Sequence, residues 1–119
     1  MPRYSSFGLA NKVAHITGDH VFAPDEAIAS LAAQPPAAPA VLNVTLPGRD
    51  SPNPPNDGDS YSLMDPGLLS DGTHQVQVTA AGGSSFATGS GSTFGPSTLG
   101  TARIIFTYLA AQNAWMISE

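Results

Sequence analysis

The chain has 119 residues and no cysteine, which limits it to one domain and excludes disulfides and thiolate metal sites. Only 11% of its residues are Asp, Glu, Lys or Arg, and its net charge of −5 disfavours non-specific binding to nucleic acid or to an anionic membrane. No apolar run approaches the roughly 20 residues that span a bilayer, and the first residues lack a signal-peptide layout, so we expect synthesis in a cytoplasm.

The first part of the chain, residues 1–39, is predicted to be an extended N-terminal arm. Residues 12–17 and 20–23 are prone to form short strands, although an extended segment fits them equally well. The arm has too many apolar residues for a freely solvated tail, so we expect it to lie along another surface, either the β body of the same chain or a neighbouring subunit. The predicted interface residues are Tyr4, Phe7, Leu9, Val13, Ile16, Val21 and Phe22.

Residues 24–33 are the one helical candidate. A proline suits the first helical position, and the two acidic residues after it complement the helix dipole. The prolines of residues 34–39 would end this short helix and favour an extended spacer. We therefore predict that the arm, with its helix, precedes a β body at residues 40–119. This body alone is small, which favours burial against other copies of the chain.

The body is predicted to be all-β, because short alternating segments are separated by turn signals. Val76 and Val78, for example, alternate with Gln75 and Gln77. This spacing indicates a small β-sandwich or jelly-roll-like body. The expected strands are residues 40–46, 61–64, 74–79, 84–87, 92–94, 101–110 and 114–118.

The longest β-prone block, residues 101–110, is predicted to form a hairpin with residues 114–118. Alternation places Ile104, Phe106 and Tyr108 on one face, and Arg103, Ile105 and Thr107 on the other. We expect the first set to pack in the core with Trp115 and Ile117.

No motif in the chain predicts catalysis or a cofactor. The glycine-rich residues 89–95 miss the dinucleotide spacing by one residue, and no phosphate loop or hydrolase elbow is present. His15, His20 and His74 have no metal-binding spacing. We therefore expect no enzyme activity, no catalytic, cofactor-binding or metal site, and turns in place of a nucleotide loop.

Two features have alternative readings. The acidic loop at residues 50–59 is read mainly as turn chemistry, although Asp50, Asp57 and Asp59 would be the ligands if it bound calcium. Trp115 could be a platform on which a sugar stacks, but its place in the last strand favours a core or interface anchor.

A pattern of short pieces resembles a known group of proteins. The pieces are Val44-Thr-Leu-Pro47, Asp57-Gly58, Gln75-Val-Gln-Val-Thr79, Ala102-Arg-Ile-Ile-Phe-Thr-Tyr108 and Asn113-Ala-Trp-Met-Ile117. They are spread over roughly Leu42 to Ser118, about two-thirds of the chain. They resemble the small β modules of tailed-bacteriophage virions, namely capsid decoration (cement) proteins, head fibres and collar or fibre domains.

This resemblance implies a non-enzymatic structural protein of the virion, made in the host cytoplasm and placed on the capsid surface. It implies a homo-oligomer, with a trimer favoured, whose N-terminal arm attaches it to the major capsid protein or another virion protein. No nucleic acid or membrane partner is implied. The alternative is a carbohydrate-binding adhesin or tail-fibre tip that uses Trp115, Tyr61 and the 49–59 loop.

Overall fold

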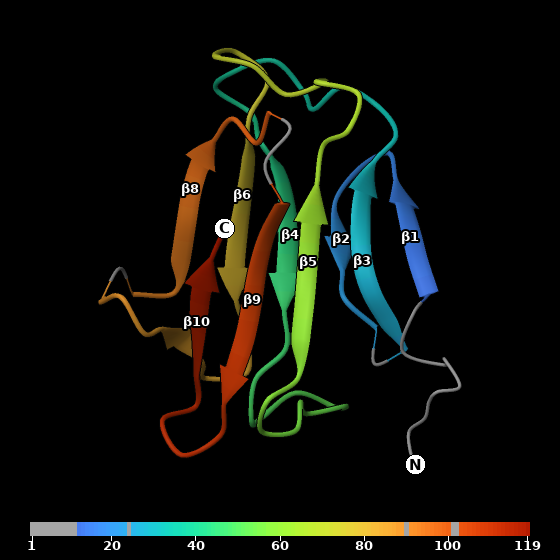
Figure 1. Ribbon diagram of the computed structural model, residues 1–119. Coiled ribbons are helices and arrows are strands. Elements are labelled where there is room, and N and C mark those ends of the chain that lie inside the picture. Colours follow the sequence, from blue (N-terminus) through green and yellow to red (C-terminus); the bar gives the residue numbers. More distant parts are fainter. Residues whose placement is uncertain (1–11, 24, 90, 101–102) are drawn as a thin grey trace.

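The computed structural model describes residues 12–23, 25–89, 91–100 and 103–119, and these residues form two mixed β-sheets that lie as two layers (Figure 1). The six-stranded sheet has the order β1 (Lys12–Ile16), β3 (Glu26–Leu31), β5 (Ser60–Met64), β9 (Arg103–Leu109), β10 (Ala114–Ser118) and β7 (Ser85–Phe86). The four-stranded sheet has the order β2 (His20–Val21), β4 (Leu42–Leu46), β6 (Val76–Ala80) and β8 (Thr93–Ser97).

The chain alternates between the two sheets from β1 to β9, so that each strand lies in the sheet opposite its predecessor. As a result β1, β3 and β5 are parallel neighbours in one sheet, and β2, β4 and β6 are parallel neighbours in the other. β8 and β9 join antiparallel to β6 and β5, and β10 completes an antiparallel hairpin with β9. Pairing is therefore mostly between segments far apart in the sequence.

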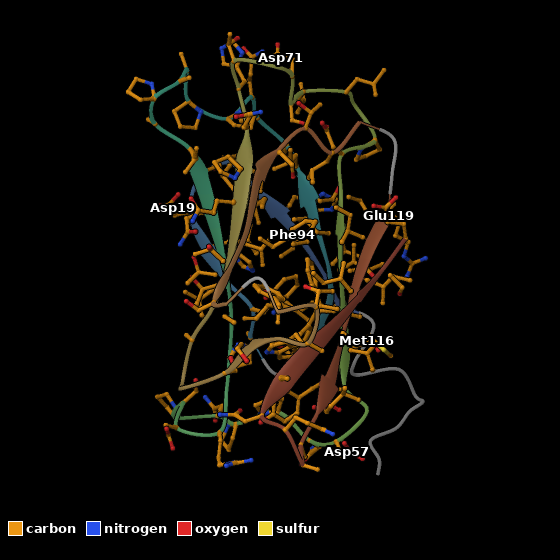
Figure 2. All side chains as sticks on the ribbon, turned by 90° about the vertical axis from the view of Figure 1, so that its left-hand side faces the viewer. Asp19, Asp57, Asp71, Phe94, Met116 and Glu119 are labelled. Carbon is orange, nitrogen blue, oxygen red and sulfur yellow. The ribbon has the colours of Figure 1, made fainter. Side chains whose placement is uncertain are left out.

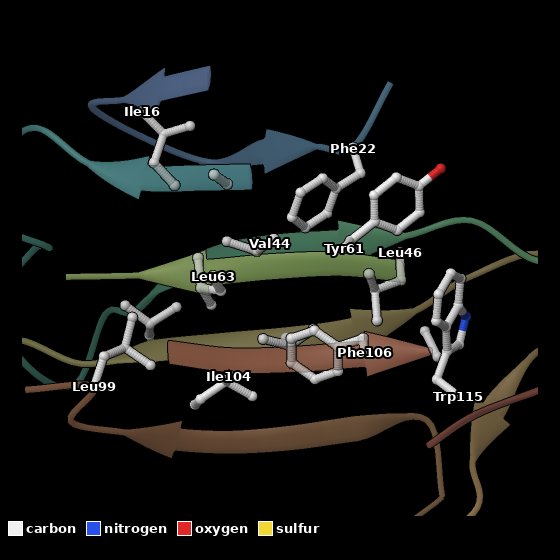
Figure 3. Packing of buried hydrophobic residues seen from close by; sticks show 14 of the residues in the cluster. Ile16, Phe22, Val44, Leu46, Tyr61, Leu63, Leu99, Ile104, Phe106 and Trp115 are labelled. Carbon is white, nitrogen blue, oxygen red and sulfur yellow. The ribbon is translucent and has the colours of Figure 1, made fainter. Parts of the chain in front are cut away.

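The core is one cluster of buried side chains contributed by both sheets (Figure 3). In β4 and β6 every second residue is buried, as alternation of side chains across a strand requires. In β9 the buried residues are Ile104, Phe106 and Tyr108, as predicted. The expected strands of residues 40–46, 61–64 and 74–79 are thereby confirmed as β4, β5 and β6. The hairpin predicted from residues 101–118 is confirmed in its described part by β9 and β10, and residues 101–102 lie outside the described residues.

The predicted division into an arm before residue 39 and a body after it does not describe residues 12–39. β1 and β3 extend the six-stranded sheet beside β5, and β2 pairs with β4 in the other sheet. Four residues of this region, Ile16, Phe22, Ala29 and Leu31, are part of the core. The described part of the arm is thus an integral part of the β fold, and residues 1–11 lie outside the described residues.

The predicted helix at residues 24–33 is wrong, because Glu26–Leu31 form β3. This strand pairs with β1 on one side and β5 on the other, which satisfies backbone groups that a helix would bond internally. The Glu26 carboxylate accepts hydrogen bonds from the Ala23 amide and the His20 ring, each at 2.8 Å. It therefore does not have the predicted role of complementing a helix dipole. Among the described residues there is no helix of a length and hydropathy that would cross a membrane.

Candidate interaction surface

The outward side of the six-stranded sheet is unusually apolar. Ala114, opposite Leu109, faces this side by register but is buried. Strand register places the following further residues there, on the side opposite Leu63, Ile104 and Phe106: Val13, Ile28, Met64, Ile105, Leu109 and Met116, with His15, Ser30, Ser60, Ser62, Arg103, Thr107 and Ser118 between them. We call this set the outer face. Its apolar members are exposed or half-buried, and none of them packs against the core cluster. These side chains are therefore available to another surface.

The apolar members of the outer face adjoin one another across the strands. Val13 lies opposite Ile28, and only Ser62 separates Ile28 from Ile105 along the same row. Met64 and Met116 lie diagonally beside that row, within reach of its side chains. Met116 is 49% exposed and Val13 is 39% exposed. The outer face is thus a continuous patch across β1, β3, β5, β9 and β10.

The outward side of the four-stranded sheet is different, because it follows the polar-outward alternation of a solvated sheet. It presents Asn43, Thr45, Gln77 and Thr79 from β4 and β6. The Thr79 hydroxyl donates to Asn43 Oδ1 at 2.8 Å, so this polar surface is ordered by its own hydrogen bonds. The outward side of the four-stranded sheet is therefore polar, whereas that of the six-stranded sheet is partly apolar.

Asp19, Asp57 and Asp71 lie away from the outer face, whereas Glu119 directly follows Ser118 of β10 at its margin (Figure 2). Asp71 lies at one end of the molecule and Asp57 at the other, with Met116 between them along the strands (Figure 2). Asp19 lies on the side of the four-stranded sheet, where its carboxylate accepts the Asn43 amide at 2.8 Å. Among the described residues, none of those assigned to the outer face is acidic. Its one formal charge is Arg103, whose Nε donates to the Ser62 hydroxyl at 3.2 Å.

The structure separates the interface residues predicted from the sequence into three groups. Ile16 and Phe22 are core residues, with 5% and 4% of their surfaces exposed, so they are not part of an interface. Val13 belongs to the outer face, whereas Val21 is 64% exposed beside the four-stranded sheet. Tyr4, Phe7 and Leu9 lie outside the described residues. The signal that would have found the outer face is the pair Ile105 and Met116, apolar residues at outward positions.

A recess of about 440 Å³ adjoins Val21. It is lined mainly by Val21, Phe22, Thr45, Pro47, Pro52 and Ala81. Apolar residues predominate, and none of its lining residues is charged. Such a recess can hold an apolar side chain, but it has no group that would perform a reaction.

The acidic loop is ordered by turn and loop hydrogen bonds. Asp57 Oδ1 accepts the Ala110 amide at 2.9 Å, and Asp59 Oδ2 accepts the Asn56 amide at 2.8 Å. The Arg49 side chain donates to the Ala110 carbonyl at 2.9 Å. The loop is thereby attached to the turn between β9 and β10. Among the described residues, Asp50, Asp57 and Asp59 are not brought together as a group of three potential metal ligands.

Trp115 is a core anchor and not a sugar platform. Its side chain is fully buried, and its indole Nε1 donates to the Pro47 carbonyl at 3.0 Å. Tyr61 and Tyr108 pack against it with ring centroids 5.6 Å and 5.0 Å away. Because Tyr61 is only 5% exposed, the predicted carbohydrate-binding surface loses both of its aromatic residues.

A cluster of Asp71, Thr73 and His74 has the residue types of a catalytic triad but not its geometry. The Thr73 hydroxyl and the Asp71 carboxylate both approach the same ring nitrogen, His74 Nδ1, at 3.1 Å and 2.8 Å. A triad needs the nucleophile and the carboxylate on opposite ring nitrogens. The hydrogen bond to His74 and that from the Thr73 amide lower the pKa of Asp71 from 3.8 to about 2. The cluster orders a turn.

Two other buried or half-buried carboxylates have structural partners. The His20–Glu26 pair, 2.8 Å apart, lies between β2 and β3. Asp65 is 1% exposed and accepts the Leu69 and Ser70 amides and the Ser70 hydroxyl at 2.7–2.8 Å. Ser70 in turn accepts the Leu99 amide at 2.9 Å. Glu26 and Asp65 thus form their hydrogen bonds and ion pair within the fold.

Comparisons with protein-family models, with curated proteins and with solved structures found no match to this chain.

Proposed function

We propose that this chain is a structural protein of a tailed-bacteriophage virion, a capsid decoration or head-fibre subunit with a jelly-roll-like sandwich body. The observation that carries this proposal is the outer face, an almost uncharged and partly apolar surface on an all-β body. A solvated sheet is expected to be polar on its outward side, so an apolar outward side indicates an interaction surface. The resemblance of the sequence to virion β modules agrees with a role in assembly.

In this function the product of binding is mechanical stability. A subunit that bridges neighbouring capsid proteins adds buried surface that must be broken before the shell can open. Asp57, Asp65 and Asp71 are already engaged in turns and loops, which suits an inert module. Attachment is assigned to the N-terminal residues 1–11, which carry Tyr4, Phe7 and Leu9, and to the apolar recess beside Val21.

The test is binding to empty expanded capsids of the encoding phage, assembled without this protein. We expect the purified chain to co-sediment with these capsids and to raise the temperature at which they lose integrity. A protein that ignores capsids and binds glycans instead would show the proposal to be wrong and would favour the adhesin.

Removal of residues 1–11 tests the site of attachment. This deletion leaves β1 and the core residues Ile16 and Phe22 in place, whereas deletion through residue 24 would remove two strands. We expect the shortened chain to keep the thermal unfolding midpoint of the full chain and to lose capsid binding. Undiminished binding by the shortened chain would exclude residues 1–11 from the mechanism.

A further inference from the structure

We propose that the outer face of the six-stranded sheet binds the same face, or an adjoining part of it, on a second copy of this chain. The inference rests on the proposed function, because it names the partner that the apolar surface would contact within an assembly. It concerns association of the purified chain, which can be measured without any capsid.

The first argument is the character of the surface. Ile105 lies in the middle of the outer face, on a strand that is paired on both sides by β5 and β10. Ile28 lies in β3, which is likewise paired on both sides. Neither residue belongs to the core cluster. Two aliphatic side chains on central strands, pointing away from the core, gain burial only from a surface outside the described residues.

The second argument is charge. The chain carries a net charge of −5, so two copies repel one another over most of their surfaces. The described part of the outer face has no acidic residue, and Asp57 and Asp71 lie at opposite ends of the molecule (Figure 2). Contact through this face keeps these carboxylates at the rim, where water screens them. Contact between the ends would bring like charges together.

The third argument is size. Five strands spaced about 4.8 Å apart, with about five residues each rising about 3.4 Å, give a footprint of roughly 24 by 17 Å. This footprint is roughly 400 Å², about half of the roughly 800 Å² that a standard specific interface buries on each partner, which places it among weak, transient contacts. The contact is therefore expected to be reversible in dilute solution. On a particle, attachment raises the local concentration of the chain, so the same weak contact would be occupied.

Sedimentation equilibrium of the purified chain tests the proposal. We expect concentration-dependent self-association below about 500 μM, as a small specific interface would give. A chain that remains monomeric over this range would overturn the proposal. The same experiment on Ile105→Lys and Met116→Lys is expected to show association weakened about tenfold or more, because each buries an unpaired charge in the contact.

The matched controls lie on the other sheet. Gln77→Lys places the same charge at an outward position of a central strand, and Thr93→Lys places it at an exposed position of β8, opposite Thr79. Both are expected to associate like the unmodified chain. Equal weakening by the variants of both sheets, or none by the outer-face variants, would overturn the assignment. Met116→Lys decides the matter should Ile105→Lys unfold, because Met116 is 49% exposed and its replacement leaves the core intact.

Labelling gives a second readout, because the chain has no cysteine of its own. Thr107→Cys on the outer face and Thr79→Cys on the four-stranded sheet each provide one site for a spin label. We expect label-to-label distances between copies to be short for Thr107→Cys and long for Thr79→Cys, and the reverse would contradict the proposal. Failure of self-association with intact capsid binding would remove this inference alone, whereas the opposite result would remove only the virion function.

Discussion

At the scale of single residues, several carboxylates of this protein stabilise its turns and loops by accepting hydrogen bonds. Asp65 holds three donors from the two residues Leu69 and Ser70, and Glu26 joins the Ala23 amide to the His20 ring. Asp57 accepts an amide from the turn between β9 and β10. Because each side chain already accepts hydrogen bonds, binding a cation or a substrate there would cost those bonds.

The turn at Asp71 makes this use of carboxylates measurable. The His74 side chain and the Thr73 amide lower the pKa of Asp71 from 3.8 to about 2. Because the folded-state pKa is depressed, the ionised group stabilises the fold above about pH 4, and that contribution is lost as the pH falls from about 4 to about 2. Asp71→Asn is therefore expected to reduce stability at neutral pH and to flatten this acid limb. The effect is small because Asp71 is exposed to solvent.

Urea unfolding at about pH 7, 4 and 2 checks this expectation. The control is Asp25→Asn, which loses only a solvent-exposed pair with Lys12 at 3.6 Å. It should retain the acid limb of the unmodified chain. Identical pH dependence of Asp71→Asn and the unmodified chain would show that this carboxylate does not contribute.

At the scale of elements, strands were predicted well where alternation is strong and poorly where pairing decides. Val76 and Val78 alternate with glutamines, and their strand followed from the sequence. Residues 24–33 were predicted to be a helix, because a proline followed by two acidic residues favours the start of a helix. Pairing with β1 and β5 overrode that preference. Because these pairings join segments far apart in the sequence, the local pattern of residues does not predict them.

The candidate site shows the same limit. Sequence reasoning assigned Ile16 and Phe22 to an interface because their segment is too apolar for a solvated tail, and both pack in the core. It placed Ile105 on the face opposite Ile104 and Phe106, and this was correct. What the sequence could not show is that the outward residues of β1, β3, β5, β9 and β10 adjoin, because that follows from the strand order.

The turn between β9 and β10 depends on Asn113, which has a positive φ of 49°. Its Oδ1 also accepts hydrogen bonds from the Arg49 amide and the Tyr108 hydroxyl. Asn113→Gly keeps the favourable φ and loses the acceptor, so we expect a loss of about 1–2 kcal/mol. Asn113→Ala loses both and is expected to be about 1 kcal/mol less stable than Asn113→Gly.

Chemical denaturation of the two variants measures this difference directly. Gln112→Ala, an exposed neighbour in the same turn, is the matched control and should change stability by less than about 0.5 kcal/mol. An alanine variant as stable as the glycine variant would mean that the backbone conformation at this position carries no cost.

At the scale of the whole molecule, charge and apolar surface are separated in space. The ends of the sheets carry acidic loops, one sheet has a polar outward side, and the other has the nearly uncharged outer face. In the proposed self-association, contact through the outer face leaves the acidic ends of the two copies outside the contact. Association is then driven by apolar burial and opposed by long-range repulsion, and these two terms respond differently to salt.

Salt dependence therefore distinguishes this mode of association from one held by ion pairs. Screening of repulsion is expected to strengthen self-association several-fold as sodium chloride rises from about 20 mM to about 500 mM. Glu119→Gln removes one negative charge directly after Ser118, at the margin of the outer face. This variant should associate more tightly than the unmodified chain at low salt and respond less to added salt. An interface of opposite charges would weaken with salt, and that result in sedimentation would contradict the apolar contact.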